Sequence, residues 1–204
     1  MPSVAFESQV VPEPPAWPQS VVTVVGNPRA GSRTAAAAAS VAELLASELG
    51  TPYRIDELID LVTFAPAIFQ GDEASAEARA ALESAVELVS SASVIVLATP
   101  VYKGSYTGLL KSFLDVLRPA ALAGAVVVPL TVSAAPSHKL LADQHLRPVL
   151  SELGASAPVP GVILEESDLE DLQVVLSSWI RTNATIIQAT TIALQPVAEP
   201  TPAR

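Results

Sequence analysis

Short apolar runs alternate with longer amphipathic segments along most of this chain. Val21 to Val25 is a continuous β-branched run, and Val94 to Ala98 and Ala125 to Thr131 are further apolar runs. Each has the length and composition of a strand that is buried on both faces, so we expect three interior strands. Tyr53 to Ile55 and Val159 to Leu164 predict two more strands, the first of them short.

Helical periodicity fills the intervals between these runs and predicts five helices. We expect one helix that Gly50 and Pro52 end, one that begins near Asp72, one from Leu109 to Leu117, one from about Ser137 to Leu153, and one that opens with Ser167 and Glu170. Asp72 is the expected N-cap of the second helix. Ser167 and Glu170 have the spacing of a capping box.

Five strands that alternate with five helices predict an α/β fold in which a five-stranded parallel sheet is covered on both faces. Ligands of such sheets bind at the carboxyl ends of the strands. The chain has 204 residues, enough for one substantial core. Proline is frequent near both ends, so we expect a single domain over 19–194, a flexible N-terminal extension over 1–18 and a flexible tail over 195–204.

The composition excludes several classes of function. A formal net charge of −10 disfavours binding to nucleic acids and anionic membrane surfaces, because both bind to clusters of Lys and Arg. The sequence has no cysteine and two histidines, so we expect neither thiolate catalysis nor a metal centre. No basic segment followed by an apolar run opens the sequence, and the uncharged stretch 119–137 is interrupted by Gly and Pro. We therefore expect a cytoplasmic protein that does not enter a membrane.

The segment Gly26 to Thr34, GNPRAGSRT, joins the first strand to the first helix and has the chemistry of a phosphate site. Free backbone N–H groups and the positive end of the helix dipole point into such a loop. Two arginines add forked, charge-assisted donors, and serine and threonine add hydroxyls. The segment is neither a Walker loop nor GxGxxG. The alternative is that these residues only cap the helix, but capping does not explain two arginines in an acidic protein.

A second segment, TPVYKGSYTGLLKSFLD from Thr99 to Asp115, follows the central strand at its carboxyl end. Pro100 and Gly104 suit a tight loop, and Tyr102 supplies an aromatic rim for a ligand. Taken alone, this segment fits a surface tyrosine at the start of a helix nearly as well as a ligand contact. Its placement beside the first loop favours a ligand site.

These two segments together resemble the NADPH-dependent FMN reductase family, in particular the reductase components of two-component alkanesulfonate monooxygenase systems. The similarity continues through VVVPLTVSAAPSHKLLADQHLRPVLSELGA and spans roughly residues 20 to 165. It implies a flavodoxin-like three-layer sandwich, FMN as cofactor or substrate, NADPH or alternatively NADH as reductant, a homodimer or homotetramer, and a flavin-dependent monooxygenase as a partner. By position it assigns the phosphate to Asn27, Arg29, Ser32, Arg33 and Thr34, and the isoalloxazine and ribityl groups to Pro100, Val101, Tyr102, Lys103 and Gly104.

The chain departs from this family's pattern at the loop after the fourth strand. Many relatives have a glycine pair where this sequence has Ser133 and Ala134, and side chains there narrow the space beside a flavin ring. In the following helix Pro148 lacks an N–H, so the turn around Gln144 should be irregular, and a π-bulge is one way to absorb this. By resemblance, Gln144 or His145 occupies a bulge that influences flavin release. The alternative is that His145 is an ordinary surface histidine.

The expected reaction needs no catalytic acid, base or nucleophile, because the resemblance implies that hydride passes from nicotinamide C4 to flavin N5. The protein then contributes stacking, orientation and N–H groups near Lys103 and Gly104 for the negative charge of reduced flavin. Two alternatives remain open at this point. One is an FMN-containing quinone or azo reductase, and the other is a non-catalytic flavodoxin-like electron carrier.

Overall fold

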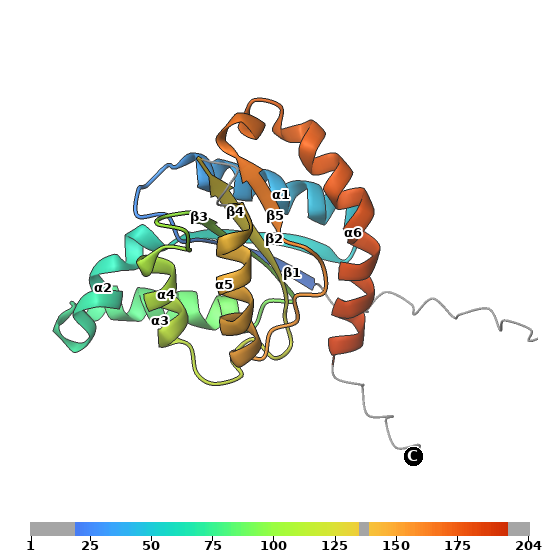
Figure 1. The fold of residues 1–204 in the computed structure, drawn as a ribbon. Coiled ribbons are helices and arrows are strands. Elements are labelled where there is room, and N and C mark those ends of the chain that lie inside the picture. The colour runs from blue at the N-terminus through green and yellow to red at the C-terminus, as the bar shows by residue number, and fades with distance from the viewer. Residues whose placement is uncertain (1–18, 135–138, 196–204) are drawn as a thin grey trace, which may run out of the picture.

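The computed structural model of the chain describes residues 19–134 and 139–195, in which five parallel strands form one sheet (Figure 1). The strand order in the sheet is β2-β1-β3-β4-β5. This is the order of flavodoxin-like folds, in which the chain reverses its direction of winding between β1 and β3. The strands are β1 (Gln19–Val25), β2 (Tyr53–Asp60), β3 (Val94–Pro100), β4 (Val126–Ser133) and β5 (Val162–Glu165).

Helices cover both faces of this sheet and make three layers (Figure 1). One face carries α1 (Arg33–Leu49) and the long α6 (Leu172–Leu194), and the other carries α2 (Ala65–Gln70), α3 (Ala76–Ser90), α4 (Gly108–Val116) and α5 (Lys139–Glu152). Short 3₁₀ helices complete the connections: η1 (Leu61–Phe64), η2 (Gly71–Glu73) and η4 (Glu166–Leu169). The predicted three-layer α/β sandwich with a five-stranded parallel sheet is confirmed.

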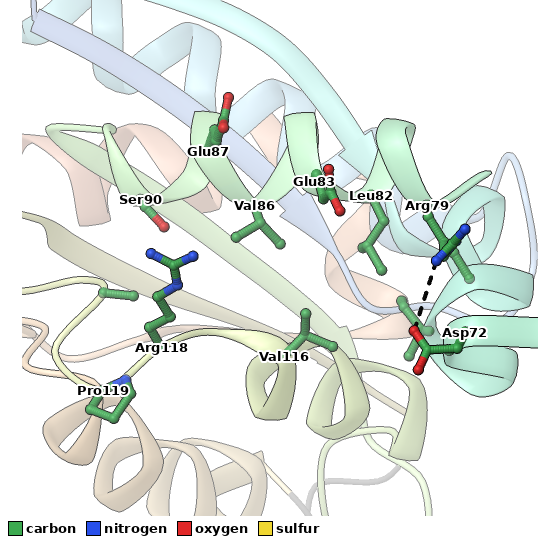
Figure 2. Close-up of a pocket in the computed structure, with 14 residues that line it drawn as sticks. Asp72, Arg79, Leu82, Glu83, Val86, Glu87, Ser90, Val116, Arg118 and Pro119 are labelled. Atoms are coloured by element: carbon green, nitrogen blue, oxygen red, sulfur yellow. Dashed lines mark ion pairs between the residues drawn. The ribbon is translucent and has the colours of Figure 1, made fainter. Parts of the chain in front are cut away.

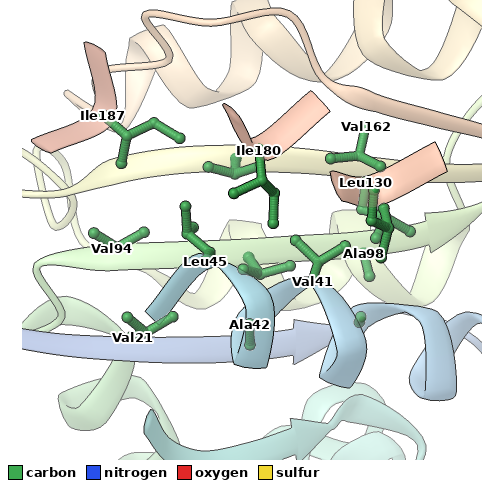
Figure 3. Close-up of a cluster of buried hydrophobic side chains, with 14 of the residues drawn as sticks. Val21, Val41, Ala42, Leu45, Val94, Ala98, Leu130, Val162, Ile180 and Ile187 are labelled. Carbon is green, nitrogen blue, oxygen red and sulfur yellow. The ribbon is translucent and has the colours of Figure 1, made fainter. Parts of the chain in front are cut away.

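Strand residues alternate between the two cores, as the period of two along a strand requires. Val21 and Val25 of β1 contribute to the core beneath α1 and α6, whereas Val22 and Val24 contribute to the opposite core. In the first core, α1 meets the sheet through the buried Ala37, Ala38 and Ala42 together with Val41 and Leu45. Helix α6 adds Ile180 and Ile187 to the same core (Figure 3). The small alanine side chains let α1 approach the strands closely, which fixes where the N-terminus of this helix points.

The second strand is longer than the sequence predicted. β2 continues past Ile55 to Asp60, and it lies at the edge of the sheet beside β1. Most of its residues are exposed or half-buried, and only Tyr53 and Ile59 are buried. Of the acidic residues between these two positions, Glu57 is exposed and Asp56 is half-buried beside Arg54. Their polarity concealed the strand from an analysis based on apolar runs.

Two predicted helix starts were wrong. Asp72 lies in η2, and α3 begins after Ser75, whose hydroxyl accepts a hydrogen bond from the Ala78 N–H at 3.2 Å. Ser167 and Glu170 do not form the capping box; Glu165 and Asp168 form one at the start of η4 instead. In both places several polar residues of N-cap type lie within a few positions of each other, and local propensity does not rank them.

Some sequence predictions fall outside the described residues. These are the flexible extension over 1–18, the tail beyond residue 195, and the first residues of the helix predicted from Ser137. Over the described ranges, no helix is both long enough and apolar enough to cross a membrane.

Candidate functional site

Three loops meet at the carboxyl edge of the sheet. Residues 26–32 join β1 to α1, residues 101–107 join β3 to α4, and the loop after Ser133 joins β4 to α5, with 135–138 outside the described residues. β1 and β3 are neighbours in the sheet, but their connections lead to helices on opposite faces. Such a reversal opens a crevice between the two loops, which is where sheets of this kind bind ligands.

A set of short contacts at Gly26 holds the first two loops together. The Gly26 N–H donates to the Ala98 carbonyl at 2.7 Å, and the hydroxyl of Thr107 donates to the Gly26 carbonyl. A Cβ atom on Gly26 would lie 2.6 Å from Leu110 Cβ, so only glycine fits there. The same Thr107 hydroxyl accepts the Leu110 N–H at 3.2 Å and caps α4.

The predicted phosphate residues divide into buried supports and exposed donors. Asn27 and Thr34 are buried, and the Asn27 Nδ2 donates to Thr34 Oγ1 at 3.1 Å. The Asn27 Oδ1 accepts the Arg29 N–H at 3.0 Å, which closes a turn typical of asparagine. Because both ends of its side chain are bonded inside the loop, Asn27 shapes the loop. Arg29 itself is exposed.

Ser32 and Arg33 stand at the N-terminus of α1. The Ser32 hydroxyl accepts the Ala35 N–H at 3.2 Å as the N-cap, which confirms the capping part of the sequence interpretation. The Arg33 guanidinium lies 2.8 Å from the Glu166 carboxylate, an ion pair with both side chains largely exposed. Exposed pairs of this kind are worth about 0–1 kcal/mol, so a dianion at the helix terminus can displace Glu166.

Asp60, at the end of β2, is a further carboxylate against the first loop. Burial raises the pKa of its carboxyl, and hydrogen bonds from the backbone N–H groups of Val62 and Gly31 oppose that rise. Its Oδ1 is buried without a hydrogen-bond partner. The Gly31 N–H is therefore engaged by protein, as are the N–H groups of Arg29 and Ala35.

The residues predicted to contact a ring system form a tight turn after β3. The Tyr102 N–H donates to the Ser105 carbonyl at 2.8 Å, and the Ser105 N–H returns a bond to the Tyr102 carbonyl at 3.1 Å. Lys103 and Gly104 at the tip both have positive φ angles, 52° and 77°. Tyr102 and Lys103 are exposed, whereas Pro100 is buried and Val101 and Gly104 are half-buried.

The remaining predicted residues border the same edge. Ser133 ends β4 and is buried, and Ala134 next to it is exposed. Gln144 and His145 are exposed on α5, where the His145 Nδ1 lies 3.0 Å from the Ser105 Oγ of the turn. α5 stays α-helical from Lys139 to Glu152 with Pro148 inside it, so the expected π-bulge is not present there. Pro148 is accommodated within regular helix.

A groove of about 890 Å³ lies elsewhere, between α2, α3 and α4. Figure 2 shows Leu82 and Val86 of α3 pointing toward Val116 of α4, and Arg118 pointing toward Ser90. The groove lies between the helices and contains none of the residues that form the carboxyl-edge crevice. It is therefore a separate surface feature.

Comparison with known proteins identifies the family to which this chain belongs. Residues 20–168 match the family model described as NADPH-dependent FMN reductase. The chain belongs to the NADPH-dependent FMN reductase family. As a member of this family it is an oxidoreductase that acts on FMN and NAD(P)H, which confirms the resemblance found in the sequence. The match includes β1 to β5 and all three loops at the carboxyl edge.

Individual relatives support this family assignment. The FMN reductase (NADPH) of Pseudomonas aeruginosa is 32% identical over 78% of this chain and 83% of its own length. The FMN reductase (NADPH) of Escherichia coli strain K12 is 42% identical, but the match covers 45% of this chain and 48% of that protein, about half of each. Among solved structures, the apo form of an NADH:FMN oxidoreductase aligns with a TM-score of 0.67 at 30% identity, over 89% of this chain and 92% of the other.

Sequence analysis missed four residues at the carboxyl edge of the sheet. Thr99 and Thr107 connect the two loops, and the Thr99 Oγ1 accepts the Thr107 N–H at 3.2 Å. The sequence pattern could have identified Thr107, since a threonine directly before a helical apolar pattern is a common N-cap. No sequence pattern identifies Asp60 or Glu166, because both reach the first loop from strand ends that are distant in sequence.

Proposed function

We propose that this FMN reductase binds FMN in the carboxyl-edge crevice and that NAD(P)H reduces the flavin there by hydride transfer. One observation carries the proposal: the loop that begins α1 and the turn that follows β3 are fastened to each other through Gly26 and Thr107. The element assigned to the phosphate and the element assigned to the ring system of one ligand therefore lie side by side. Preorganised elements of this kind reduce the entropy lost on binding.

The phosphate is assigned to the N-terminus of α1. Exposed Arg29 and Arg33 supply positive charge, and the helix terminus supplies N–H donors and the positive end of its dipole. Asn27, Ser32 and Thr34 support this loop from within through their own hydrogen bonds. In this proposal Arg33 exchanges Glu166 for the phosphate, because a dianion offers it a stronger charge-assisted bond.

The flavin ring is assigned to the turn after β3. When bound, FMN supplies the acceptor of the hydride, and the chain supplies position and polarity. In the described residues, the N–H groups of Lys103 and Gly104 have no hydrogen-bond partner within the protein, so they can donate to the edge of a ring that gains negative charge. Tyr102 borders the ring, Pro100 and Val101 form the floor, and Ser133 with Ala134 limit the space on the far side.

We propose that the protein is a homodimer or homotetramer assembled through the groove between α2, α3 and α4. Val116 is 43% exposed in this groove, and the adjacent Phe69 is 63% exposed, large values for such side chains. The groove also carries arginines and glutamates, so two copies related by a two-fold axis can present opposite charges to each other.

A flavin-dependent monooxygenase as recipient of the reduced flavin is part of the same proposal, as is residence in the cytoplasm, where NAD(P)H is available. The exposed positions Gln144 and His145 at the rim of the crevice support a role in flavin release. An exposed rim suits a ligand that leaves after each turnover.

Steady-state kinetics test the proposal against its alternatives. NADPH and NADH oxidation are measured with FMN, FAD, riboflavin and a quinone, and bound flavin is assessed by absorbance of the purified protein. A flavin reductase gives sequential kinetics in which FMN is a saturable substrate. Ping-pong kinetics with tightly retained FMN would favour a quinone or azo reductase instead. An electron carrier would not oxidise either nicotinamide cofactor in the presence of FMN and air.

A further inference from the structure

We propose that His145 is a positioning residue, which from α5 holds Ser105 and thereby the Tyr102–Ser105 turn in the conformation that receives the flavin ring. The inference rests on the proposed function, because it concerns the same crevice. It differs from a role of His145 in a helix bulge, since α5 is regular at this point. The observation is the 3.0 Å contact between His145 Nδ1 and Ser105 Oγ, which joins residues 40 positions apart.

The turn has a conformation that needs support. Two reciprocal hydrogen bonds between Tyr102 and Ser105 close it, and both residues at its tip have positive φ angles. Gly104 adopts such an angle freely, but Lys103 has a Cβ atom, for which the left-handed region is unfavourable. A strained turn persists only where its surroundings hold it, and such turns are concentrated at ligand sites.

Few contacts fix this turn to the rest of the protein. At its start, the Val101 N–H donates to the Val132 carbonyl at 2.9 Å, and at its end Thr107 is bonded to Thr99. Within the described part of the chain, His145 to Ser105 is the side-chain hydrogen bond that links residues 102–105 to another element. The position of the turn between its two ends therefore depends on α5.

α5 is a firm support at the level of His145. Leu146 is fully buried in the core beneath the helix. Arg147 bonds Asp143 at 2.9 Å and donates to the carbonyls of Ala157 and Val159 at 2.9 and 2.7 Å. These contacts tie the two residues that follow His145 to the fold, so the imidazole is presented from a fixed backbone. The Ser105 hydroxyl can donate to neutral Nδ1 or accept from a protonated one, so the contact does not require one particular tautomer.

A double-mutant cycle on this pair is the test. We expect Ser105→Ala, His145→Ala and the double variant each to weaken FMN binding by about the same factor, roughly fivefold, because one shared hydrogen bond is lost in all three. Riboflavin binding should weaken by that same factor, since the turn contacts the ring and not the phosphate. His145→Asn should restore binding, because its amide reaches nearly the position of Nδ1. Ser151→Ala, at an exposed serine of the same helix, is the control and should bind FMN as the wild type does.

The outcomes separate this inference from the proposed function. Wild-type protein that does not bind FMN would refute the proposed function itself. Wild-type binding together with unchanged affinity in Ser105→Ala and His145→Ala would refute the positioning role alone. Additive losses in the double variant would also refute it, because they would show that the two side chains act independently. The absorption band of bound flavin gives a second readout, which should shift in His145→Ala and return in His145→Asn.

Discussion

At the scale of single residues, Gly26 sets the distance between the loops of the candidate site. Gly26→Ala should destabilise the fold by about 1–3 kcal/mol, because the new Cβ meets Leu110 Cβ at 2.6 Å on a fully buried side chain. Gly108→Ala is the matched control. A Cβ there meets nothing within 4 Å, and alanine favours the helix, so stability should be unchanged or higher. Urea denaturation of both variants checks this, and equal stabilities would contradict it.

Asp60 gives a prediction for the dependence of stability on pH. Burial raises the pKa of its carboxyl above the ordinary 3.8, so the folded state binds this proton more tightly than the unfolded state does. Between the unfolded and the raised folded pKa, the folded protein holds more protons, and this group's contribution to stability is lost as pH rises. Asp60→Asn removes the charge, so its stability relative to wild type should increase as pH rises from about 4 toward neutrality.

Denaturation midpoints of Asp60→Asn and wild type over this pH range measure the effect. Glu57→Gln is the control, since Glu57 is an exposed carboxylate on the same strand and should show no comparable trend. A constant difference between Asp60→Asn and wild type at every pH would show that the buried carboxyl does not titrate as described.

At the scale of elements, Thr107 connects the start of α4 with the loop before α1. Thr107→Val keeps the shape of the side chain but removes the helix cap and leaves the Gly26 carbonyl without its hydroxyl donor. We expect a loss of about 1–3 kcal/mol in the free energy of unfolding. Thr107→Ser retains the hydroxyl and should recover most of it. Chemical denaturation distinguishes the two, and equal losses in both variants would contradict the proposed contacts.

The elements that the sequence predicted best are those buried on both faces. β1, β3 and β4 are mostly apolar runs rich in valine, a pattern typical of an interior parallel strand. β2 was predicted too short because an edge strand exposes one side to water, and its acidic residues resemble a loop. The short α2 between β2 and α3 was missed because six residues give too little periodicity to recognise.

The residue types of the candidate site could be predicted from the sequence, but the contacts between distant segments could not. The two loops were recognised because arginines, glycine and hydroxyls near a helix start have the chemistry of a phosphate site. It did not supply the pairing of Arg33 with Glu166 or of Ser105 with His145, because each joins segments distant in sequence. The phosphate contact of Asn27 stays a prediction, and the hydrogen bonds by which its side chain braces the loop were not foreseen.

At the scale of the whole molecule, the groove between α3 and α4 predicts self-association. Val116→Glu should shift the protein toward the monomer, because it places a charge in the middle of the proposed contact. Val174→Glu is the control: Val174 is 73% exposed on α6, over the opposite face of the sheet, and its replacement should leave the oligomer intact. Sedimentation velocity checks both variants. A wild-type monomer, or equal dissociation in both, would contradict the assignment.

The central claim is that α1 and the loop before it bind the phosphate of FMN, and comparison of FMN with riboflavin tests it most directly. Riboflavin has the same ring but no phosphate, so wild-type protein should bind FMN about 10- to 100-fold more tightly. In the Arg29→Ala/Arg33→Ala double variant this ratio should fall toward one, while riboflavin affinity stays the same. Equal affinities for the two flavins in wild-type protein, or an unchanged ratio in the double variant, would contradict the account.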